Sequence, residues 1–416
     1  MAFEYSKDIV KPPEYLDIQF IEDMTENALR ETNVKILKAY FQMCGAGGEN
    51  FCSRVYRIKV QYDLPQTGKR GELSVIVKCI QPIEGVDFLD ELKVFGKEKT
   101  TFEETLPMLS LFLEPGGRVS GRLYHSIKRP VNCLAFEDLN MSGYHIASRE
   151  LGLDEKHARL VMKRIGQFHA ISMHLAKKKP FIRQLYNQGM LSRNALKPES
   201  FLLRFFTGNA KALLKLITKW SDYSNIADKL QNYVENLPDN LVRAQAPLPD
   251  DNFRVLNHGD LWVNNILFKY DDKHEVQDCT FIDYQMTVWA SPGIDLNYFL
   301  YTSVQLDVLK NKFDELLKEY YKSFCAKLVE LNYEPLPSFQ QVCDEVHRRA
   351  SYGFFANFGI YPLVIQDKEI AGDTNLDNLI DEDFAAKKQE QIFGSKYIAE
   401  TLRYTLRKFD KMGIWD

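Results

Sequence analysis

The sequence has few of the features that mark a secreted, membrane or metal-cluster protein. Its seven cysteines are scattered and contain no C-x-x-C pair, so neither a zinc site nor a disulfide framework is indicated. No apolar run approaches the roughly 18 residues that would indicate a membrane span. The N-terminal segment has no apolar stretch of the signal-peptide type. Together these absences predict a protein of the reducing cytoplasm.

The chain also lacks a strong excess of charge of either sign. The formal net charge is −4 over 416 residues, which gives no electrostatic reason to expect nucleic acid as a partner. No internal repeat or low-complexity tract is present, and no feature indicates an obligate protein partner. With 45% hydrophobic and 26% charged residues, the composition is that of a globular protein. At about 100–200 residues per domain, the length predicts two or three domains.

The N-terminal third combines helical and strand patterns. Residues 18–43 carry apolar side chains at a loosely helical spacing, and we expect them to be helical. Strict alternation over residues 55–62 (VYRIKVQY) predicts a half-buried strand. A polar stretch with proline and glycine over 63–72 predicts a turn, and 73–80 a second strand with Lys78 near its end. The expected structure is an antiparallel pair.

The rest of the chain is mostly helical in pattern. Residues 86–104 are expected to be helical and carry Glu98, and 131–139 read as a strand. From about residue 150 helical patterns dominate, apart from two short strands at 265–270 and 279–285 joined by a charged turn. A small part that contains strands, followed by a larger helical part, is an unusual order and narrows the choice of fold.

The segment NHGDLWVNNILF, residues 257–268, places a polar cluster directly before a strand. Phosphoryl transfer from ATP requires a carboxylate to orient the acceptor hydroxyl and hard oxygen ligands for magnesium. Protein kinases supply a loop aspartate, an asparagine five residues later, and an aspartate on the next hairpin. Asp260, Asn265 and Asp283 have this order and spacing. Upstream, Lys78 follows a glycine-rich segment, and Glu98 comes twenty positions later.

These motifs resemble those of the ecdysteroid kinase-like family, which is related to choline kinases and aminoglycoside phosphotransferases. Residues 258–268 match its HGDxWxxNxxF signature, and 282–285 (IDYQ) resemble its IDFQ segment. Residues 137–139 resemble its EDL segment and 95–98 its FxxE helix. Trp262 is the specific part, since aminoglycoside phosphotransferases usually have histidine there. The match runs from about residue 45 to beyond Asp295.

The resemblance implies an α+β fold of the protein-kinase-like, two-lobed type. A small β-containing lobe would cover residues 1–138, and a large helical lobe residues 139–416. The cofactors would be ATP and Mg²⁺. Asp260 would act as catalytic base, while Asn265 and Asp283 would ligate magnesium. Lys78 would contact the phosphates and Glu98 would hold Lys78.

Further roles follow from the same resemblance. The backbone of Glu137 and Leu139 would receive the adenine, Asp295 would brace the catalytic loop, and His258 would hold that loop near Asp283. The glycine-rich turn differs from the GxGxxG of protein kinases, and its candidate nucleotide contacts are Gly47, Gly48 and Asn50. His169 lies on an amphipathic helix and is interpreted as a core histidine outside the site.

An acceptor pocket is expected around an aromatic stretch late in the chain. A small-molecule site is mostly apolar with a few polar groups. Such a pocket suits a lipophilic alcohol better than a polycation. An acidic cluster over 373–383 could instead bind a cationic substrate, although a solvated turn is the simpler interpretation. The candidate pocket residues are Trp262, Gln285, Tyr352, Phe355 and Phe358.

The predicted function is an ATP-dependent phosphotransferase acting on a hydroxyl of an ecdysteroid or another lipophilic or xenobiotic alcohol. One alternative is a choline-, ethanolamine- or aminoglycoside-type kinase, against which Trp262 and Gln285 argue. Another is a pseudokinase that acts as a ligand-binding or scaffold protein, against which the intact set of site residues argues. A true protein kinase is disfavoured because the chain has no HRD arginine, no APE motif and no evident activation loop.

Overall fold

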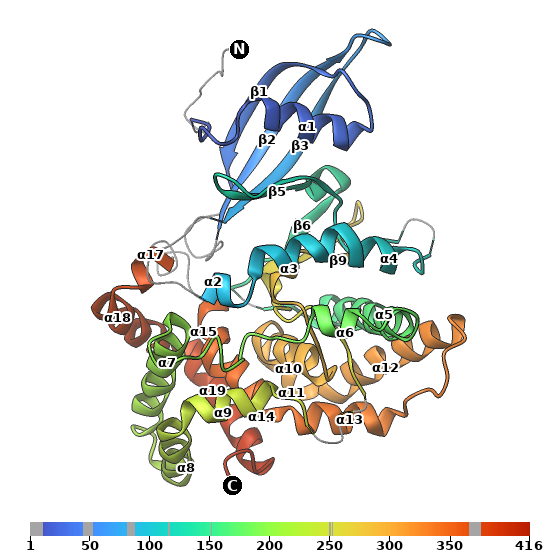
Figure 1. Cartoon of the computed structure of the whole chain (residues 1–416). Helices are drawn as coiled ribbons and strands as arrows, with labels where there is room; N and C mark the ends of the chain where they lie inside the picture. Colours follow the sequence, from blue (N-terminus) through green and yellow to red (C-terminus); the bar gives the residue numbers. More distant parts are fainter. Residues whose placement is uncertain are drawn as a thin grey trace. The chain divides into compact units, whose positions relative to one another are not determined.

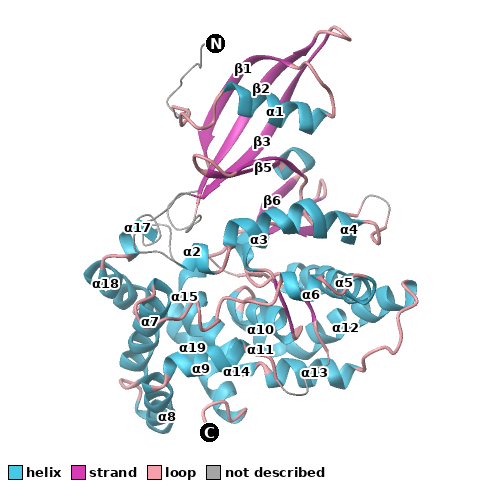
Figure 2. Ribbon diagram, in the orientation of Figure 1, coloured by secondary structure: helices cyan, strands magenta, loops and turns pink. Residues whose placement is uncertain are grey.

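The computed structural model separates into two compact units. One comprises residues 1–84 and 120–145, and the other 85–119 and 146–416. Strands dominate the first unit and helices the second (Figures 1 and 2), which confirms the predicted α+β, protein-kinase-like fold class. The lobe boundary at 138/139 stays a prediction. The structure describes residues 11–44, 53–80, 88–114, 117–150, 152–248, 251, 253–365 and 376–416.

The first unit is built on a five-stranded antiparallel sheet of order β1-β2-β3-β5-β4. The predicted strand pair corresponds to β2 and β3, which are joined by a turn as expected. A 3-10 helix at Leu139–Ser142 and the short strand β6 (Tyr144–Ile146) follow the sheet. The elements of the sheet and its helix are α1 (Ile18–Leu29), β1 (Lys35–Met43), β2 (Arg54–Leu64), β3 (Lys69–Ile80), β4 (Leu123–Ile127) and β5 (Asn132–Glu137).

The prediction of one helix over 18–43 is right only for its first half. Helix α1 ends at Arg30, which adopts a left-handed conformation with φ 58°. Residues Lys35–Met43 form β1, which pairs antiparallel with β2. A register shift between Ile36 and Lys38 interrupts the alternation of the strand. The buried side chains therefore fall at a spacing that resembles a helix more than a regular strand.

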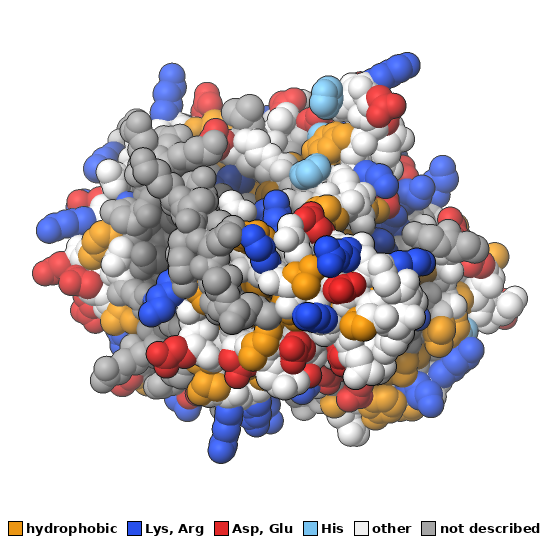
Figure 3. Space-filling model, turned by 90° about the horizontal axis from the view of Figure 1, so that it is seen from above, with side chains coloured by type: hydrophobic (Ala, Val, Ile, Leu, Met, Phe, Trp, Pro, Cys, Tyr) orange, Lys and Arg blue, Asp and Glu red, His pale blue; other side chains and the backbone are white. Residues whose placement is uncertain are grey.

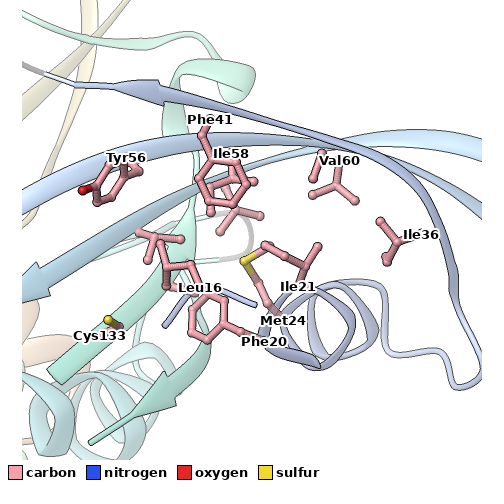
Figure 4. Close-up of a cluster of buried hydrophobic side chains, with 14 of the residues drawn as sticks. Leu16, Phe20, Ile21, Met24, Ile36, Phe41, Tyr56, Ile58, Val60 and Cys133 are labelled. Atoms are coloured by element: carbon pink, nitrogen blue, oxygen red, sulfur yellow. The ribbon is translucent and has the colours of Figure 1, made fainter. Parts of the chain in front are cut away.

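The core of the first unit lies between α1 and the sheet. Phe20, Ile21 and Met24 on the helix face Ile58 and Val60 on β2 (Figure 4). Each of these side chains is at most 4% exposed. Removal of apolar surface from water is the main force that favours this packing.

Strand β3 is interior to the sheet and places Lys78 between two neighbours. Its register pairs Lys78 with Val55 on one side and with Leu134 on the other. After β5 the chain is fixed by Asp138, whose carboxylate accepts hydrogen bonds from Arg57 at 2.7 Å and Ser74 at 2.6 Å. It also accepts from the backbone N–H of Asn140 at 3.2 Å. Asp138 therefore orders the segment after Glu137.

The second unit is largely helical, with a few short strands. The long helices α5 and α12 pack on each other. The strands are β7 (Val255–Asn257), β8 (Ile266–Tyr270), β9 (Val276–Phe281) and β10 (Val288–Ala290). The helices described in this unit are α2 (Phe88–Glu91), α3 (Val94–Thr100), a π-helical turn (Thr101–Thr105), α4 (Leu106–Ser110), α5 (Glu155–Lys178), α6 (Ile182–Leu185), α7 (Phe201–Ile217), a 3-10 turn (Ser221–Tyr223), α8 (Ser224–Glu235), α9 (Leu237–Gln245), 3-10 turns (Val263–Asn265 and Tyr284–Met286), α10 (Gly293–Thr302), α11 (Leu306–Asn311), α12 (Phe313–Glu330), α13 (Phe339–Arg348), α14 (Ala350–Phe355), a second π-helical turn (Ala356–Ile360), α15 (Tyr361–Val364), α17 (Leu376–Leu379), α18 (Glu382–Phe393) and α19 (Lys396–Lys411).

The described surface agrees with the balanced composition. On the face shown in Figure 3, basic and acidic side chains are interspersed with hydrophobic ones. Within the residues that the structure describes, no helix combines the length and apolar character needed to cross a membrane.

The inner face of β2 should be much more sensitive to truncation than its outer face. Ile58 is fully buried, whereas its neighbour Lys59 is exposed on the other side of the strand. Ile58→Ala should lower the free energy of unfolding by about 2–5 kcal/mol, because it leaves a cavity in the core. Lys59→Ala should change it by less than about 0.5 kcal/mol. Urea unfolding measures both, and equal effects would contradict the packing described here.

Candidate active site

The loop that carries Asp260 starts from a short buried strand pair. Strand β7 pairs antiparallel with β10, and both strands are largely buried. The side chain of Asn257 closes this pair, because its Nδ2 lies 3.2–3.4 Å from carbonyl oxygens of both strands. Its Oδ1 accepts a hydrogen bond from the backbone N–H of Asp295 at 3.1 Å. Asn257 thus ties the start of the loop to helix α10.

Gly259 makes the turn into the loop and cannot be replaced without distortion. Its φ of +82° lies in the left-handed region, which side chains other than glycine rarely adopt. A Cβ atom at this position would lie 2.0 Å from the carbonyl oxygen of Met286. The backbone of the loop therefore passes against the chain that follows Asp283. Both the left-handed backbone and the close approach of the Met286 carbonyl explain why the HGD motif has glycine at this position.

Asp295 braces the loop from the first turn of α10. Its Oδ2 accepts from the backbone N–H of His258 at 2.7 Å, and its Oδ1 from that of Gly259 at 2.9 Å. The residue has no exposed surface. A buried carboxylate is tolerated only when hydrogen bonds replace its water, so the two amides and Asp295 hold each other in place.

His169 also holds Asp295, although its place on an amphipathic helix indicates only a core residue. Its Nε2 lies 3.1 Å from Oδ2 of Asp295, and its Nδ1 lies 3.0 Å from the hydroxyl of Tyr320. Burial lowers the pKa of His169, against the opposing effect of Asp295. We therefore assign a neutral ring that donates from Nε2 to Asp295 and accepts at Nδ1 from Tyr320. It is a buried, satisfied histidine, as interpreted from the sequence, but it supports the loop.

His258 joins the loop to the end of β9. Its Nε2 lies 2.9 Å from the carbonyl oxygen of Ile282, which directly precedes Asp283. Its Nδ1 accepts from the backbone N–H of Asp260 at 3.3 Å. The ring packs on Tyr284, with centroids 4.6 Å apart. One side chain therefore contacts the segments that carry both aspartates of the predicted site.

Asn265 contacts Asp260 and lies beside the second aspartate. Its Nδ2 donates to the backbone oxygen of Asp260 at 2.9 Å and to its Oδ2 at 3.1 Å. Its backbone oxygen accepts from the backbone N–H of Ile282 at 3.0 Å. This contact directly precedes the first pair of the β8–β9 hairpin, Ile266 with Phe281. Asn265 and Asp283 therefore emerge at the same end of the β8–β9 hairpin.

The oxygen atoms at this end of the hairpin suit magnesium. Asn265 Oδ1 accepts from no described residue, and Asp283 is partly exposed. Amide and carboxylate oxygens are the hard ligands that Mg²⁺ prefers, usually with phosphate and water completing the shell. Within the described residues no group of three His, Cys, Asp or Glu side chains could hold a metal alone. The donor set fits an ion that is shared with a nucleotide.

Asp283 has an unusual backbone for a residue other than glycine. Its φ and ψ are 65° and 64°, in the left-handed region. Aspartate adopts this conformation more readily than most residues, but at a cost in free energy. Such a conformation at a polar turn beside Asn265 is typical of a functional residue.

Tyr298 is a contact of Asp260 that sequence reasoning missed. Its hydroxyl donates to Oδ1 of Asp260 at 2.5 Å, from a position one turn after Asp295 on α10. Burial, followed by the charge of Asp260, raises the pKa of Tyr298 well above its usual range. The spacing of three residues between Asp295 and Tyr298 indicates that both lie on one face of a helix. The residues next to Tyr298 in the sequence do not indicate that it contacts Asp260.

The predicted nucleotide contacts are distributed over both units. Lys78 is 7% exposed on β3, and Glu98 is 1% exposed on α3 in the other unit. Glu137 ends β5, where its backbone N–H donates to Arg122 at 2.8 Å, and Leu139 begins the following 3-10 helix. Their roles toward the nucleotide stay predictions. Gly47, Gly48 and Asn50 lie outside the described residues.

The predicted acceptor residues are all buried. Tyr352, Phe355 and Phe358 have no exposed surface, and Phe355 packs edge-on against Phe206 with centroids 4.9 Å apart. Their contacts are those of core residues between helices, and their role in a pocket stays a prediction. Trp262 and Gln285 are 8% and 6% exposed.

The acidic cluster is only partly described. Asp373 lies outside the described residues. Asp381 caps α18 by accepting from the backbone N–H of Phe384 at 2.9 Å, and the side chain of Glu382 is 81% exposed. These contacts favour a solvated helix start over a cation site.

Gly259→Ala should destabilise the second unit, because the left-handed backbone and the carbonyl of Met286 both oppose a Cβ. The expected loss in free energy of unfolding is at least about 2 kcal/mol. Gly96→Ala is a matched control, since a Cβ there meets nothing within 4 Å on helix α3. It should be neutral or stabilise by up to about 1 kcal/mol. Thermal unfolding separates the two, and similar effects would rule out the close approach.

The stability should depend on pH through His169. Because its pKa is lowered in the folded protein, the unfolded chain binds the proton more readily. The free energy of unfolding should therefore fall as the pH drops below about 6.5, the usual histidine pKa. His169→Gln should flatten this slope by up to about 1.4 kcal/mol per pH unit. Urea unfolding between neutral pH and pH 5 measures the slopes.

The comparison of slopes isolates His169. The pKa of His174 is also lowered, by burial and by Lys178 and Lys177, but His174 is present in both proteins and its contribution cancels. Equal slopes in the two proteins would contradict a neutral His169 against Asp295.

Comparison with known proteins agrees with the motifs and the geometry. No curated protein matches the chain. The model of the ecdysteroid kinase-like family matches residues 47–333, which is more than half of the sequence and contains Asp260, Asn265, Asp283 and Asp295. The chain belongs to the ecdysteroid kinase-like family.

Proposed function

We propose that the protein transfers the γ-phosphoryl group of ATP to a hydroxyl of a small molecule, with Mg²⁺ as cofactor. The observation that carries the proposal is the arrangement at Asp260. Its carboxylate is partly exposed, is oriented by Asn265 and Tyr298, and lies on a loop linked by His258 to the segment before Asp283. This arrangement would supply the base and the magnesium ligands that phosphoryl transfer requires.

The proposed mechanism assigns one task to each residue. Asp260 accepts a hydrogen bond from the acceptor hydroxyl, aligns its oxygen with the γ-phosphorus, and receives its proton as the new P–O bond forms. The bond between the γ-phosphorus and the oxygen that bridges it to the β-phosphate breaks, and ADP leaves with that oxygen. Asn265 and Asp283 would hold the magnesium, which would neutralise phosphate charge. Lys78 contacts the phosphates, and Glu98 orients Lys78. The backbone of Glu137 and Leu139 receives the adenine.

The proposed acceptor is an ecdysteroid or another lipophilic alcohol, on the strength of the family. The carboxylate of Asp381 is exposed and caps a helix, which gives no support to a cationic substrate such as choline. A mass-spectrometric assay with ATP and Mg²⁺ tests the acceptor against ecdysone, 20-hydroxyecdysone, phenolic glycosides, choline, ethanolamine and kanamycin. A phosphate gained by a steroid or glycoside supports the proposal, whereas one gained only by choline, ethanolamine or kanamycin favours the alternative kinase.

Two variants test the chemistry independently of the acceptor. Asp260→Asn keeps the shape of the side chain but removes the base, so turnover should fall by about 10²–10⁴-fold with little change in ATP binding. Asp283→Ala should abolish the Mg²⁺-dependent part of the affinity for ATP, because it removes a charged ligand of the ion. Turnover by mass spectrometry and ATP binding by thermal shift measure these effects.

Asp272→Asn provides a matched control. Asp272 lies in the exposed turn between β8 and β9, so its neutralisation should change neither turnover nor nucleotide binding. Full turnover in Asp260→Asn would refute its role as base. A wild-type protein that neither binds ATP with Mg²⁺ nor phosphorylates any panel compound would favour the pseudokinase alternative.

A further inference from the structure

We propose that the surface at the end of helix α5 binds a membrane that contains anionic lipid. This surface, the basic–apolar patch, consists of six exposed residues: Leu111, Lys177, Lys178, Lys179, Phe181 and Leu185. All six belong to the second unit, and none has a task in the proposed phosphoryl transfer. The inference therefore goes beyond the proposed function and does not rest on it.

The positive charge of the patch is not neutralised by the described part of the chain. Lys177, Lys178 and Lys179 are consecutive and exposed at the end of α5. Among the described residues, no carboxylate forms an ion pair with any of the three. The segment 177–185 contains a further cation, Arg183, and no acidic residue. Burial, followed by the charges of Lys178 and Lys177, lowers the pKa of His174, which agrees with a positive potential at this surface.

Apolar side chains protrude from the short helix that follows the lysines. Phe181 and Leu185 are 43% and 44% exposed. The backbone N–H of Leu185 donates to the carbonyl oxygen of Phe181 at 3.1 Å, so the two side chains lie one turn apart on the same face. Ile182 and Tyr186 are each 1% exposed and anchor this turn in the core. The turn therefore presents an aromatic and an aliphatic side chain to solvent on a fixed support.

Contacts join these elements into one surface. Leu111, directly after α4, is 80% exposed, and the ring of the next residue, Phe112, lies 5.3 Å from Nζ of Lys178. Arg183 on α6 donates to the carbonyl oxygen of Ala176 at 3.4 Å, immediately before the lysines. Both apolar parts of the patch therefore adjoin the basic end of α5.

This combination of side chains suits a lipid surface better than a protein surface. Lysine is depleted at protein–protein interfaces, whereas each lysine near an anionic membrane strengthens binding about fivefold. Exposed leucine and phenylalanine side chains can enter the boundary between headgroups and acyl chains, where burial of apolar surface adds to the electrostatic attraction. A single exposed apolar side chain is unremarkable, but three of them around an unneutralised basic cluster match both requirements of a membrane surface.

The experiment measures the partition of the purified protein onto lipid vesicles by sedimentation. One set of vesicles contains only phosphatidylcholine, and the other an equal mixture of phosphatidylcholine and phosphatidylserine. Binding to the mixed vesicles should be at least about tenfold stronger. A rise in salt from about 0.1 M to about 1 M shortens the Debye length from about 10 Å to about 3 Å, so it should weaken this binding strongly.

Removal of the three charges should weaken binding to the mixed vesicles by about 100-fold. The variant is Lys177→Gln/Lys178→Gln/Lys179→Gln. A matched control replaces by glutamine three exposed lysines elsewhere in the second unit, Lys211, Lys219 and Lys387. Both variants remove the same charge from the chain, so a difference between them reports the patch. The control should bind like the wild type.

Substitutions of Phe181 test the apolar part in two directions. Phe181→Ala should weaken binding about fivefold, because less apolar surface enters the membrane. Phe181→Trp should strengthen it, because tryptophan favours the membrane–water interface. The side chain is 43% exposed, so neither change should disturb the fold, and thermal unfolding checks this. A general loss of stability cannot produce opposite effects in the two variants.

Absence of binding to the mixed vesicles would overturn the proposal, as would equal binding to both kinds of vesicle. Equal binding by the patch variant and its control would also overturn it, because the contact would then lie elsewhere. Retention of the protein on immobilised polyglutamate, but not on vesicles, would assign the patch to an acidic protein instead. Vesicle binding requires no acceptor, so its outcome and that of the substrate panel are independent.

Discussion

The candidate site depends on one buried carboxylate, that of Asp295. It accepts hydrogen bonds from two consecutive backbone amides of the loop that carries Asp260, those of His258 and Gly259, and from the ring of His169. A carboxylate without solvent access is stable only while such donors remain. Movement of the loop would leave its oxygen atoms without these hydrogen bonds, so the position of the Asp260 backbone is linked to the first turn of α10.

Two left-handed backbone conformations lie beside this link in the second unit, and one of them, at Asp283, is strained. Gly259 and Asp283 both have left-handed backbones, and they lie in the two segments that His258 joins. Left-handed geometry is unfavourable for Asp283 and must be offset by surrounding contacts. The hydrogen bond from Ile282 to Asn265 and the contact of His258 with Ile282 provide them. The strain is thus confined to the points where the chain turns toward the predicted metal ligands.

The parts of the structure that were predictable are those encoded by neighbouring residues. Alternation predicts β2, and the apolar run after the polar turn predicts β3. The order of Asp260, Asn265 and Asp283 predicts a loop followed by a hairpin that ends at Asp283. The predictions that failed or were incomplete depend on pairing across the chain. Strand β1 was taken as helix because its register shift hides the alternation. The role of Tyr298 was missed and His169 was interpreted as lying outside the site, because their partners lie 38 and 126 positions away.

Helix α10 carries two residues on one face that both contact the loop of Asp260, which is distant in the sequence. Asp295 and Tyr298 are three residues apart, so they lie on the same face of the helix, one turn from each other. The first fixes the backbone of the loop, and the second contacts the side chain of Asp260. Because both contacts come from a single rigid element, a shift of the helix would move the backbone and the carboxylate together. The orientation of the Asp260 carboxylate relative to its own loop is therefore preserved even when the helix moves as a body.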